Sequence, residues 1–224
     1  GHKATIQALF KERDAKIYHY NAWPPTMAAW LAAVFGKTII YQSHGLEWKR
    51  TKYTTWQQKI MKFMEWLTVK SMKNITAVSQ EQTDYFLKEY GKRCVTIPTA
   101  VNLPTDICES NVLERFNLEV DGYYLYLGRL VQDKNPNYLI KAFNQSGIKS
   151  KKLVIAGSND ADPQYVEYLH DLGAKNPNVI FTGAVYGNDK EMLLSKCFAF
   201  CLPSTLEGLP ITLLEAMSHK RICL

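Results

Sequence analysis

Residues 197–217 read CFAFCLPSTLEGLPITLLEAM, an apolar run followed by a turn and then by an amphipathic helix. The run 197–201 predicts a strand, and Pro210 fits the first helical turn because its missing N–H would be unpaired there in any case. Gly208 lets a ligand approach the backbone closely. A helix N-terminus carries partial positive charge and unpaired N–H groups, so this stretch predicts a phosphate-binding site.

Two carboxylates lie in the same stretch, Glu207 before the helix and Glu215 within it. Glu215 is surrounded by apolar residues, where a carboxylate needs a hydrogen-bonding partner. A diol such as a ribose would supply that partner. The same sequence also fits an ordinary Pro-Ser-Thr turn that caps a helix with two solvated glutamates. This stretch alone does not decide between a ligand-binding site and such a helix cap.

Composition predicts a globular protein with one large core or two smaller ones, since 46% of the 224 residues are hydrophobic and 12% are aromatic. No run of 18 or more apolar residues and no signal-peptide pattern is present, which favours a cytoplasmic location. The cysteines are odd in number, form no Cys-x-x-Cys pair and lie mostly in apolar runs, so we expect buried free thiols. They are Cys94, Cys108, Cys197, Cys201 and Cys223.

Charge is unevenly distributed along the chain. Residues 1–103 hold 15 Lys and Arg against 7 Asp and Glu, whereas residues 104–224 hold 12 against 14. Such a basic half is typical of contact with a nucleic acid, an anionic substrate or an anionic membrane.

The basic half contains a long helical pattern, residues 48–73. Two interpretations stay open for it: a core-packed helix with a solvated basic face, or a basic amphipathic surface that rests on anionic lipid. Nucleic-acid binding is disfavoured because the polar face of this helix carries no interleaved aromatic residues. The apolar residues at helical spacing are Trp56, Ile60, Phe63, Met64 and Leu67.

Short apolar runs alternate with helical patterns along the whole chain, which predicts an α/β fold with two doubly wound parallel sheets. We place the domains at residues 1–103 and 104–224. No Gly-x-Gly-x-x-Gly and no Walker A sequence follows any strand, which disfavours a nicotinamide, flavin or P-loop site. The predicted strands are 16–20, 38–42, 74–78, 94–97, 123–129, 152–156, 179–182 and 197–201. The predicted helices are 26–35, 48–73, 79–90, 135–145, 163–174 and 188–195, with a further helix from Pro210.

His44 follows the predicted strand 38–42. Ligands of open α/β sheets bind beyond the carboxyl ends of the strands, so this histidine is a candidate site residue. A histidine that only hydrogen-bonds a loop carbonyl is the alternative.

Gly128-Arg129 ends a strand, Lys134 follows in the next loop, and both precede the motif from Glu207 to Glu215. With His44-Gly45 and the run Ile97-Pro98-Thr99-Ala100-Val101-Asn102, the chain resembles a retaining glycosyltransferase of family four over nearly its whole length. Thr99 and Ala100 depart from the family's pattern at the hinge. The resemblance implies the GT-B fold, two Rossmann-like domains that face each other across a cleft.

The resemblance also implies roles. Arg129 and Lys134 would hold the diphosphate of the donor, Glu215 the ribose hydroxyls and Glu207 the donor sugar, and His44 would reach the sugar from the first domain. The donor-binding set implied is Gly128, Arg129, Lys134, Gly183, Val185, Ser204, Thr205, Glu207, Gly208, Leu209, Pro210 and Glu215, with the base near Gly183 and Val185.

The implied reaction moves a sugar, with retention of configuration, from a nucleoside-diphosphate donor to a saccharide or lipid-linked acceptor, as in surface polysaccharide biosynthesis. Two cations and a helix end stabilise the leaving diphosphate, so we expect no metal and no cofactor. We also expect a cytoplasmic protein, and contact with the inner face of the cell membrane through residues 48–73 is one of the two interpretations left open for that segment. Two alternatives remain, a non-catalytic nucleotide-sugar-binding fragment and a GT-B nucleotide-sugar epimerase. The chain starts past the family's first strand and stops within a later one, so both domains are expected to be incomplete.

Overall fold

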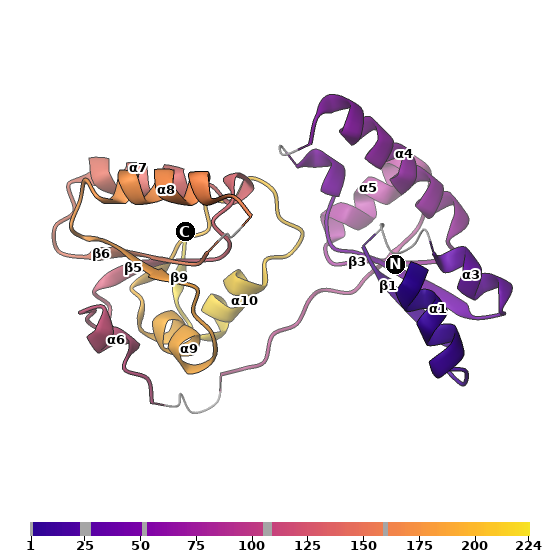
Figure 1. The fold of residues 1–224 in the computed structure, drawn as a ribbon, viewed down its shortest axis with the longest axis horizontal. Coiled ribbons are helices and arrows are strands. Elements are labelled where there is room, and N and C mark those ends of the chain that lie inside the picture. Colours follow the sequence, from indigo (N-terminus) through magenta and orange to yellow (C-terminus); the bar gives the residue numbers. More distant parts are fainter. Residues whose placement is uncertain (1, 23–27, 51–52, 105–108, 159–160) are drawn as a thin grey trace. The chain divides into compact units, whose positions relative to one another are not determined.

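The computed structural model describes residues 2–22, 28–50, 53–104, 109–158 and 161–224. The chain divides into two compact units (Figure 1). The first consists of Gly1–Thr99 with Glu207–Leu209, and the second of Ala100–Leu206 with Pro210–Leu224.

The first unit is built around a parallel sheet of order β1-β2-β3-β4. Buried and exposed residues alternate along the first strand, whereas three successive residues of the third strand are buried. The buried side chains of these strands form apolar clusters with the neighbouring helices. The strands are β1 (Ile17–Asn21), β2 (Thr38–Ser43), β3 (Asn74–Ala77) and β4 (Val95–Thr96). The helices are α1 (His2–Lys11), α3 (Ala29–Val34), η1 (Glu47–Lys49), α4 (Thr55–Ser71) and α5 (Gln80–Tyr90).

The second unit contains a parallel sheet of order β7-β6-β5-β8-β9. Figure 1 shows α7 and α8 along one face of this sheet, and α9 and α10 along the other. The strands are β5 (Tyr123–Leu127), β6 (Lys152–Ala156), β7 (Val179–Gly183), β8 (Ala199–Phe200) and β9 (Ile222–Cys223). The helices are α6 (Val112–Arg115), η2 (Gln132–Lys134), α7 (Pro136–Ser146), α8 (Pro163–Gly173), α9 (Gly187–Lys196) and α10 (Ile211–Ser218).

Alternation within β5 and β6 explains the two cores of the second unit. Tyr126 and Ile155 belong to the cluster that includes α7 and α8, whereas Leu125 and Val154 belong to the cluster that includes α9 and α10. Both faces of the sheet are therefore covered, as expected for a parallel sheet. The prediction of an α/β fold with two doubly wound parallel sheets is confirmed.

Several predicted boundaries are wrong. The predicted strand 123–129 is β5 and ends at Leu127, so Gly128 and Arg129 lie in the loop that follows it. The pattern 48–73 is not one helix, because η1 ends at Lys49 and α4 begins at Thr55 behind a capping box formed by Thr54 and Gln57. The predicted strand 197–201 shortens to β8. Pro210 is the N-cap residue of α10 rather than part of its first turn, with ψ of 119°.

Two further differences concern the first unit. The helix α1 was not expected from the sequence at all. The helix expected from residue 26 begins at Ala29, and residues 26 and 27 lie outside the described residues.

Candidate functional site

A hollow of about 240 Å³ lies where β5, β6 and β7 end in the second unit. All three strands are parallel, so the loops that follow them meet at one edge of the sheet. Three predicted site residues, Gly128, Arg129 and Val185, line it. The complete lining is Leu127, Gly128, Arg129, Ala156, Gly157, Ser158, Ala184, Val185, Tyr186, Lys190 and Thr212.

The loop after β5 is fixed by backbone contacts. The amide of Gly128 donates to the carbonyl of Ala156 at 3.0 Å, and the Tyr126 hydroxyl donates to the carbonyl of Arg129 at 2.8 Å. The strands come so close here that a Cβ on Gly157 would lie 1.9 Å from the Gly128 oxygen. The backbone that carries Arg129 is therefore held firmly beside the hollow.

Lys134 lies in the same neighbourhood, although it does not line the hollow. A Cβ on Gly128 would lie 3.9 Å from the Lys134 Cδ, so the lysine chain passes beside this glycine. The following residue, Asn135, has a positive φ of 52° and is the N-cap residue of α7.

The loop after β8 is tied to this same region. The Asn135 amide donates from Nδ2 to the carbonyl of Pro203 at 3.0 Å, and the Thr205 amide donates to the carbonyl of Asp133 at 3.4 Å. Ser204 follows Pro203, and its Oγ is buried without a hydrogen-bond partner among the described residues. The structure thus brings Ser204 and Thr205 next to the loop of Arg129 and Lys134.

The N-terminus of α10 supplies the last wall of the hollow. The amides of Leu213 and Leu214 donate to the Pro210 carbonyl at 3.2 and 3.3 Å, while Ile211 and Thr212 occupy the first turn, where amides have no partner within the helix. Thr212 lines the hollow, so this end of the helix adjoins the space beside Arg129.

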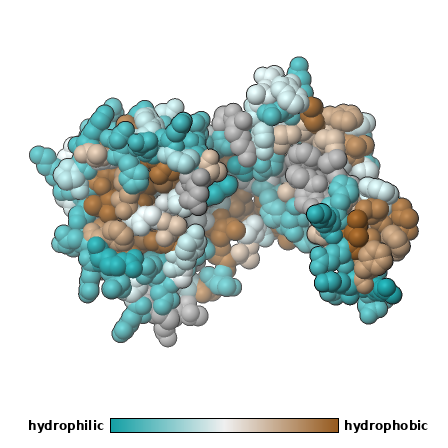
Figure 2. All heavy atoms as spheres, viewed as in Figure 1, coloured by the Kyte–Doolittle hydropathy of each residue, from teal (hydrophilic) through white to brown (hydrophobic). Residues whose placement is uncertain are grey.

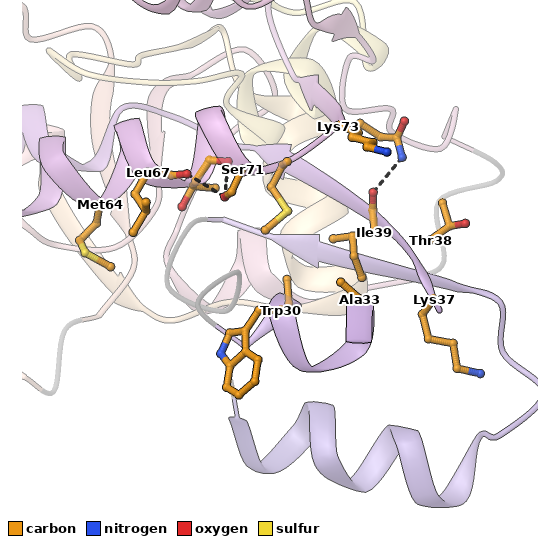
Figure 3. A pocket seen from close by; sticks show the side chains of 13 residues that line it. Trp30, Ala33, Lys37, Thr38, Ile39, Met64, Leu67, Ser71 and Lys73 are labelled. Atoms are coloured by element: carbon orange, nitrogen blue, oxygen red, sulfur yellow. Dashed lines mark hydrogen bonds between the residues drawn. The ribbon is translucent and has the colours of Figure 1, made fainter. Parts of the chain in front are cut away.

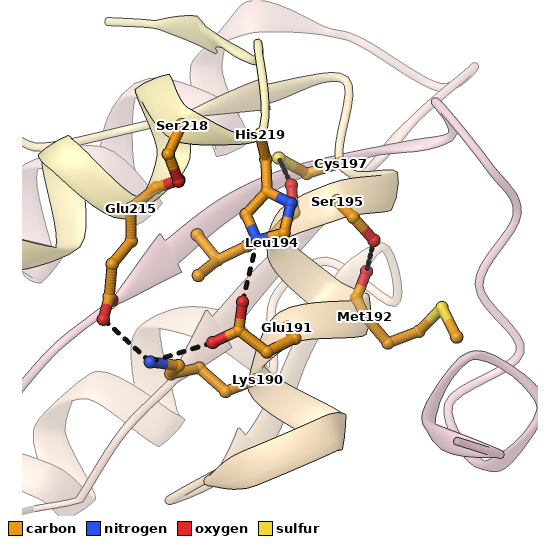
Figure 4. A network of polar contacts seen from close by, with 9 residues as sticks. All are labelled: Lys190, Glu191, Met192, Leu194, Ser195, Cys197, Glu215, Ser218 and His219. Carbon is orange, nitrogen blue, oxygen red and sulfur yellow. Dashed lines mark hydrogen bonds and ion pairs between the residues drawn. The ribbon is translucent and has the colours of Figure 1, made fainter. Parts of the chain in front are cut away.

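Glu215, within α10, has a partner that the sequence did not reveal. Its Oε1 accepts from the Lys190 Nζ at 2.8 Å, and the two side chains are 20% and 25% exposed (Figure 4). Lys190 is also 3.1 Å from Glu191, whose other oxygen is 2.8 Å from the His219 Nε2. A carboxylate among apolar neighbours is thereby paired, as burial requires.

The pKa values of this network follow from its contacts. Burial alone would lower the pKa of Lys190, but its hydrogen bonds to Glu215 and Glu191 outweigh burial and raise it. Burial would raise the pKa of Glu191, but the hydrogen bonds from His219 and Lys190 lower it. Lys190 and Glu191 are therefore both charged at neutral pH.

Lys190 is a residue that sequence reasoning missed. It lies in the first turn of α9, directly after the loop that follows β7. One signal in the sequence could have identified Lys190 as a site residue, because it follows the carboxyl end of a predicted strand. Its pairing with Glu215 could not be predicted, since Glu215 belongs to α10.

The structure also places four other predicted site residues, Gly183 and the three residues before Pro210. Gly183 ends β7 with φ of 73°, and its carbonyl accepts from the Gly157 amide at 2.8 Å. Glu207, Gly208 and Leu209 precede Pro210 and are grouped with the first unit.

His44, in the first unit, follows β2 and is exposed. Its Nε2 donates to the Asn21 Oδ1, at the end of β1, over 2.9 Å, which leaves Nδ1 with the lone pair. Partial burial lowers the pKa of His44, and the neighbouring His19 lowers it further. The imidazole is therefore neutral at neutral pH.

One sequence feature was overlooked. Asp160-Ala161-Asp162 has the Asp-x-Asp spacing that can serve a divalent cation. Asp162 instead caps α8, since its carboxylate accepts from the Tyr165 amide at 3.1 Å, and Asp160 lies outside the described residues. In the part of the chain that the structure describes, no group of three His, Cys, Asp or Glu residues is placed to hold a metal ion.

Several curated proteins match the chain, and two of them name their substrates in full. It is 26% identical to the UDP-Gal:alpha-D-GlcNAc-diphosphoundecaprenol alpha-1,3-galactosyltransferase of Escherichia coli, with 98% of this chain and 60% of the relative covered. It is 31% identical to the GalNAc-alpha-(1->4)-GalNAc-alpha-(1->3)-diNAcBac-PP-undecaprenol alpha-1,4-N-acetyl-D-galactosaminyltransferase of Campylobacter jejuni, with 48% of this chain and 29% of the relative covered. The chain spans between 24% and 60% of the length of the curated relatives it matches.

A solved structure shares the fold. The Anabaena protein HepE, in complex with UDP and glucose, matches with a TM-score of 0.78 and 16% identity, over 99% of this chain and 62% of that one. Two families match by sequence, Glycosyltransferase Family 4 over residues 2–104 and Glycosyl transferases group 1 over residues 114–224. The chain therefore belongs to the group 1 glycosyltransferases of family four, which have the GT-B fold.

Proposed function

We propose that this protein transfers a sugar from a nucleoside-diphosphate donor to a saccharide or lipid-linked acceptor, with retention of configuration and without a metal ion. The observation that carries the proposal is the hollow in the second unit, where Arg129 and the first turn of α10 line the same space. A guanidinium and a helix N-terminus are both suited to bind phosphate oxygens.

The chemistry of this arrangement favours departure of a diphosphate. As the bond between the sugar and the phosphate breaks, negative charge grows on the leaving group. Arg129, Lys134 and the amides at the start of α10 would stabilise that charge, and removal of one such preorganised donor costs on the order of 10² to 10³ in rate. This charge stabilisation is the basis for proposing metal-independent transfer.

Glu215 would accept hydrogen bonds from the ribose hydroxyls, as the family resemblance implies. The ion pair with Lys190 would then hold the carboxylate in its ionised, accepting form. Val185 lines the hollow, which supports placing the nucleobase near Val185 and Gly183.

His44 and Glu207 stay predictions as contacts of the transferred sugar. For His44 the supporting feature is its neutral imidazole, fixed by Asn21 at the carboxyl end of β1. Glu207 is supported by its place in the motif before α10.

The names of the two relatives favour a lipid-linked acceptor, since each names an undecaprenyl diphosphate substrate. We therefore include the inner face of the cell membrane as the place of action, reached through the basic segment 48–73. None of the helices that the structure describes combines the length and the apolar composition of a membrane span.

A donor panel tests the proposal. UDP-, GDP- and dTDP-sugars are mixed with the protein and a lipid-linked acceptor extract, and release of the nucleoside diphosphate is measured. We expect release with one donor, and a loss on the order of a hundredfold for Arg129→Ala. Lys175→Ala, an exposed lysine after α8, is the matched control and should retain activity.

The outcome also separates the alternatives. Binding of a nucleotide sugar without turnover would overturn transfer in favour of a binding fragment. Formation of an epimerised nucleotide sugar by NMR, without a free diphosphate, would establish an epimerase instead.

A further inference from the structure

The pair of Lys190 and Glu215 bridges two ends of the hollow in the second unit. Lys190 lies on α9, directly after the loop that follows β7, where Val185 and Tyr186 line the hollow. Glu215 lies on α10, three residues after Thr212, so these two side chains share one face of that helix. Because Thr212 also lines the hollow, the pair stands between the loop after β7 and the start of α10.

Two charged residues line the hollow, Arg129 and Lys190. In the proposed function, Arg129 and the start of α10 bind the diphosphate, and the nucleobase lies near Val185. The ribose of a nucleotide joins its base to its phosphates, so the ribose must lie between these two ends. Lys190 and its partner Glu215 are placed to meet it there.

Both members of the pair keep hydrogen-bonding capacity. An ammonium has three N–H donors, and the Lys190 Nζ directs two of them to Glu215 and Glu191, over 2.8 and 3.1 Å (Figure 4). The Glu215 carboxylate accepts from Lys190 through Oε1, and no other bond to this carboxylate occurs within the described part of the chain. One donor and one acceptor oxygen are thus available side by side at the edge of the hollow.

Glu191 and His219 hold the ammonium in place. The second carboxylate oxygen of Glu191 lies 2.8 Å from the His219 Nε2, and the His219 side chain is only 4% exposed. His219 is the C-cap residue of α10, so this contact joins α9 to α10 without Lys190. The Lys190 ammonium is therefore fixed by two carboxylates before a ligand binds, as a binding residue should be.

The larger groove of the first unit offers no such pair. It measures about 630 Å³ and lies between α4, where Met64 and Leu67 line it, and α3, where Trp30 lines it (Figure 3). Figure 2 shows apolar side chains at the surface of the first unit, in the region where Figure 1 labels α3 and α4. The charged residues among the described lining of this groove are Lys37 and Lys73, with no carboxylate. A hydroxyl that donates as well as accepts is therefore better matched by the hollow of the second unit.

We propose that Lys190 and Glu215 together bind the 2′-hydroxyl of the donor's ribose, with the Lys190 Nζ donating to it and Glu215 accepting from it. The protein thereby selects ribonucleoside diphosphates over their 2′-deoxy counterparts. A hydroxyl is both a donor and an acceptor, and the 2′-hydroxyl is the group by which proteins distinguish ribonucleotides from deoxyribonucleotides. A deoxyribose would leave the ammonium and the carboxylate without the partner that each gains from ribose. The inference rests on the proposed function and narrows its donor, since dTDP-sugars carry a deoxyribose.

Matched nucleotides that differ in one hydroxyl test the inference. UDP with dUDP, and GDP with dGDP, are titrated calorimetrically against the protein, so that the result does not depend on which base the protein accepts. A hydrogen bond to a charged group changes an affinity by about 10- to 100-fold, and we expect the ribose form to bind more tightly by this factor. Lys190→Met should narrow the preference by about tenfold. Lys175→Met, at an exposed lysine after α8, should leave it unchanged.

Three results would overturn the inference. The first is equal affinity for the ribose and deoxyribose forms. The second is a preference that Lys190→Met leaves intact while the affinity for both forms falls, which would make Lys190 a structural link between α9 and α10. The third, no binding of any of the four nucleotides, would overturn the proposed function as well.

A second variant keeps the test decisive if Lys190→Met fails to fold, which thermal melting reveals. Glu215→Gln keeps the size of the side chain on α10 but removes its charge and one acceptor oxygen. It should therefore also narrow the preference for the ribose form, and an unchanged preference would contradict the role of the pair.

Donor turnover separates this inference from the proposed function. Release of the diphosphate from a dTDP-sugar in preference to UDP- and GDP-sugars would overturn the selection of ribose alone. A preference for the ribose form in binding, without release from any donor, would overturn the transferase alone.

Discussion

The Lys190 Nζ and the Glu215 Oε1 lie 2.8 Å apart, which joins the start of α9 to the helix that follows the motif of Glu207. Lys190 also lines the hollow beside Arg129. The pair is partly buried, so it both connects two helices and carries charge to the edge of the candidate site.

Lys190→Met should weaken nucleotide binding. The substitution keeps the length of the side chain but leaves Glu215 without its cation, and it removes positive charge from the hollow. Charge-assisted hydrogen bonds contribute about 1.5–3 kcal/mol, so we expect UDP affinity to fall by about tenfold or more. Calorimetric titration measures this fall, with Lys175→Met as the control. Unchanged affinity in Lys190→Met would show that the pair is structural only.

The sequence was sufficient to predict a helix or strand where the residues at its ends mark where it begins or stops. The strand 152–156 was predicted in full because an apolar run ends at Gly157, and it is β6. The helix of residues 80–90 was predicted because Ser79 caps it and Gly91 ends it with a φ of 63°.

Prediction failed where contacts distant in sequence decide the structure. Lys190 was missed because only one of its two partners, Glu191, is its neighbour in sequence. The other partner, Glu215, lies on another helix. The orientation of α4 was not predictable either, since periodicity shows that Trp56 and Phe63 share a face but not which way the face points. The cap at Thr54 was overlooked because the apolar pattern continues upstream of it to Trp48.

Gly157→Ala should destabilise the second unit. The new Cβ would lie 1.9 Å from the carbonyl oxygen of Gly128, a backbone atom that cannot move without disturbing β5. Overpacking of this kind costs about 1–3 kcal/mol. Gly45→Ala is the control, since no atom lies within 4 Å of its added Cβ. Urea denaturation measures both, and an equal effect of the two substitutions would contradict the close approach of the strands.

Two buried cysteines of the second unit should react slowly in the folded protein. Cys197 and Cys201 are buried free thiols, and burial raises their pKa values to about 12 and about 11. Since the thiolate is the reactive form, iodoacetamide should label them only after unfolding. Cys94 and Cys223 are partly exposed and serve as internal references. Peptide mass spectrometry reads each position, and rapid labelling of Cys197 in the native state would contradict its burial. Cys108 lies outside the described residues.

Glu65 should give the first unit an unusual dependence of stability on pH. Its carboxylate accepts from the hydroxyls of Tyr85 and Tyr90 at 2.9 and 2.7 Å, which lower its pKa, but burial outweighs them and raises the pKa above the ordinary 4.5. The folded protein therefore binds more protons than the unfolded chain at pH values between 4.5 and the raised pKa. The free energy of unfolding should fall as the pH rises through this window, and the stabilisation is fully present below it.

Glu65→Gln tests this dependence, because the amide oxygen still accepts from the two hydroxyls but does not titrate. We expect the slope in this window to disappear and the stability at neutral pH to be equal or higher. Glu81→Gln, an exposed carboxylate on α5, should leave the slope unchanged. Glu65→Ala should instead destabilise by about 2–4 kcal/mol at every pH, because it opens a cavity and leaves the hydroxyls of Tyr85 and Tyr90 without their acceptor. Denaturant titrations across the acid range measure all three, and a slope that survives in Glu65→Gln would assign the pH dependence to another group.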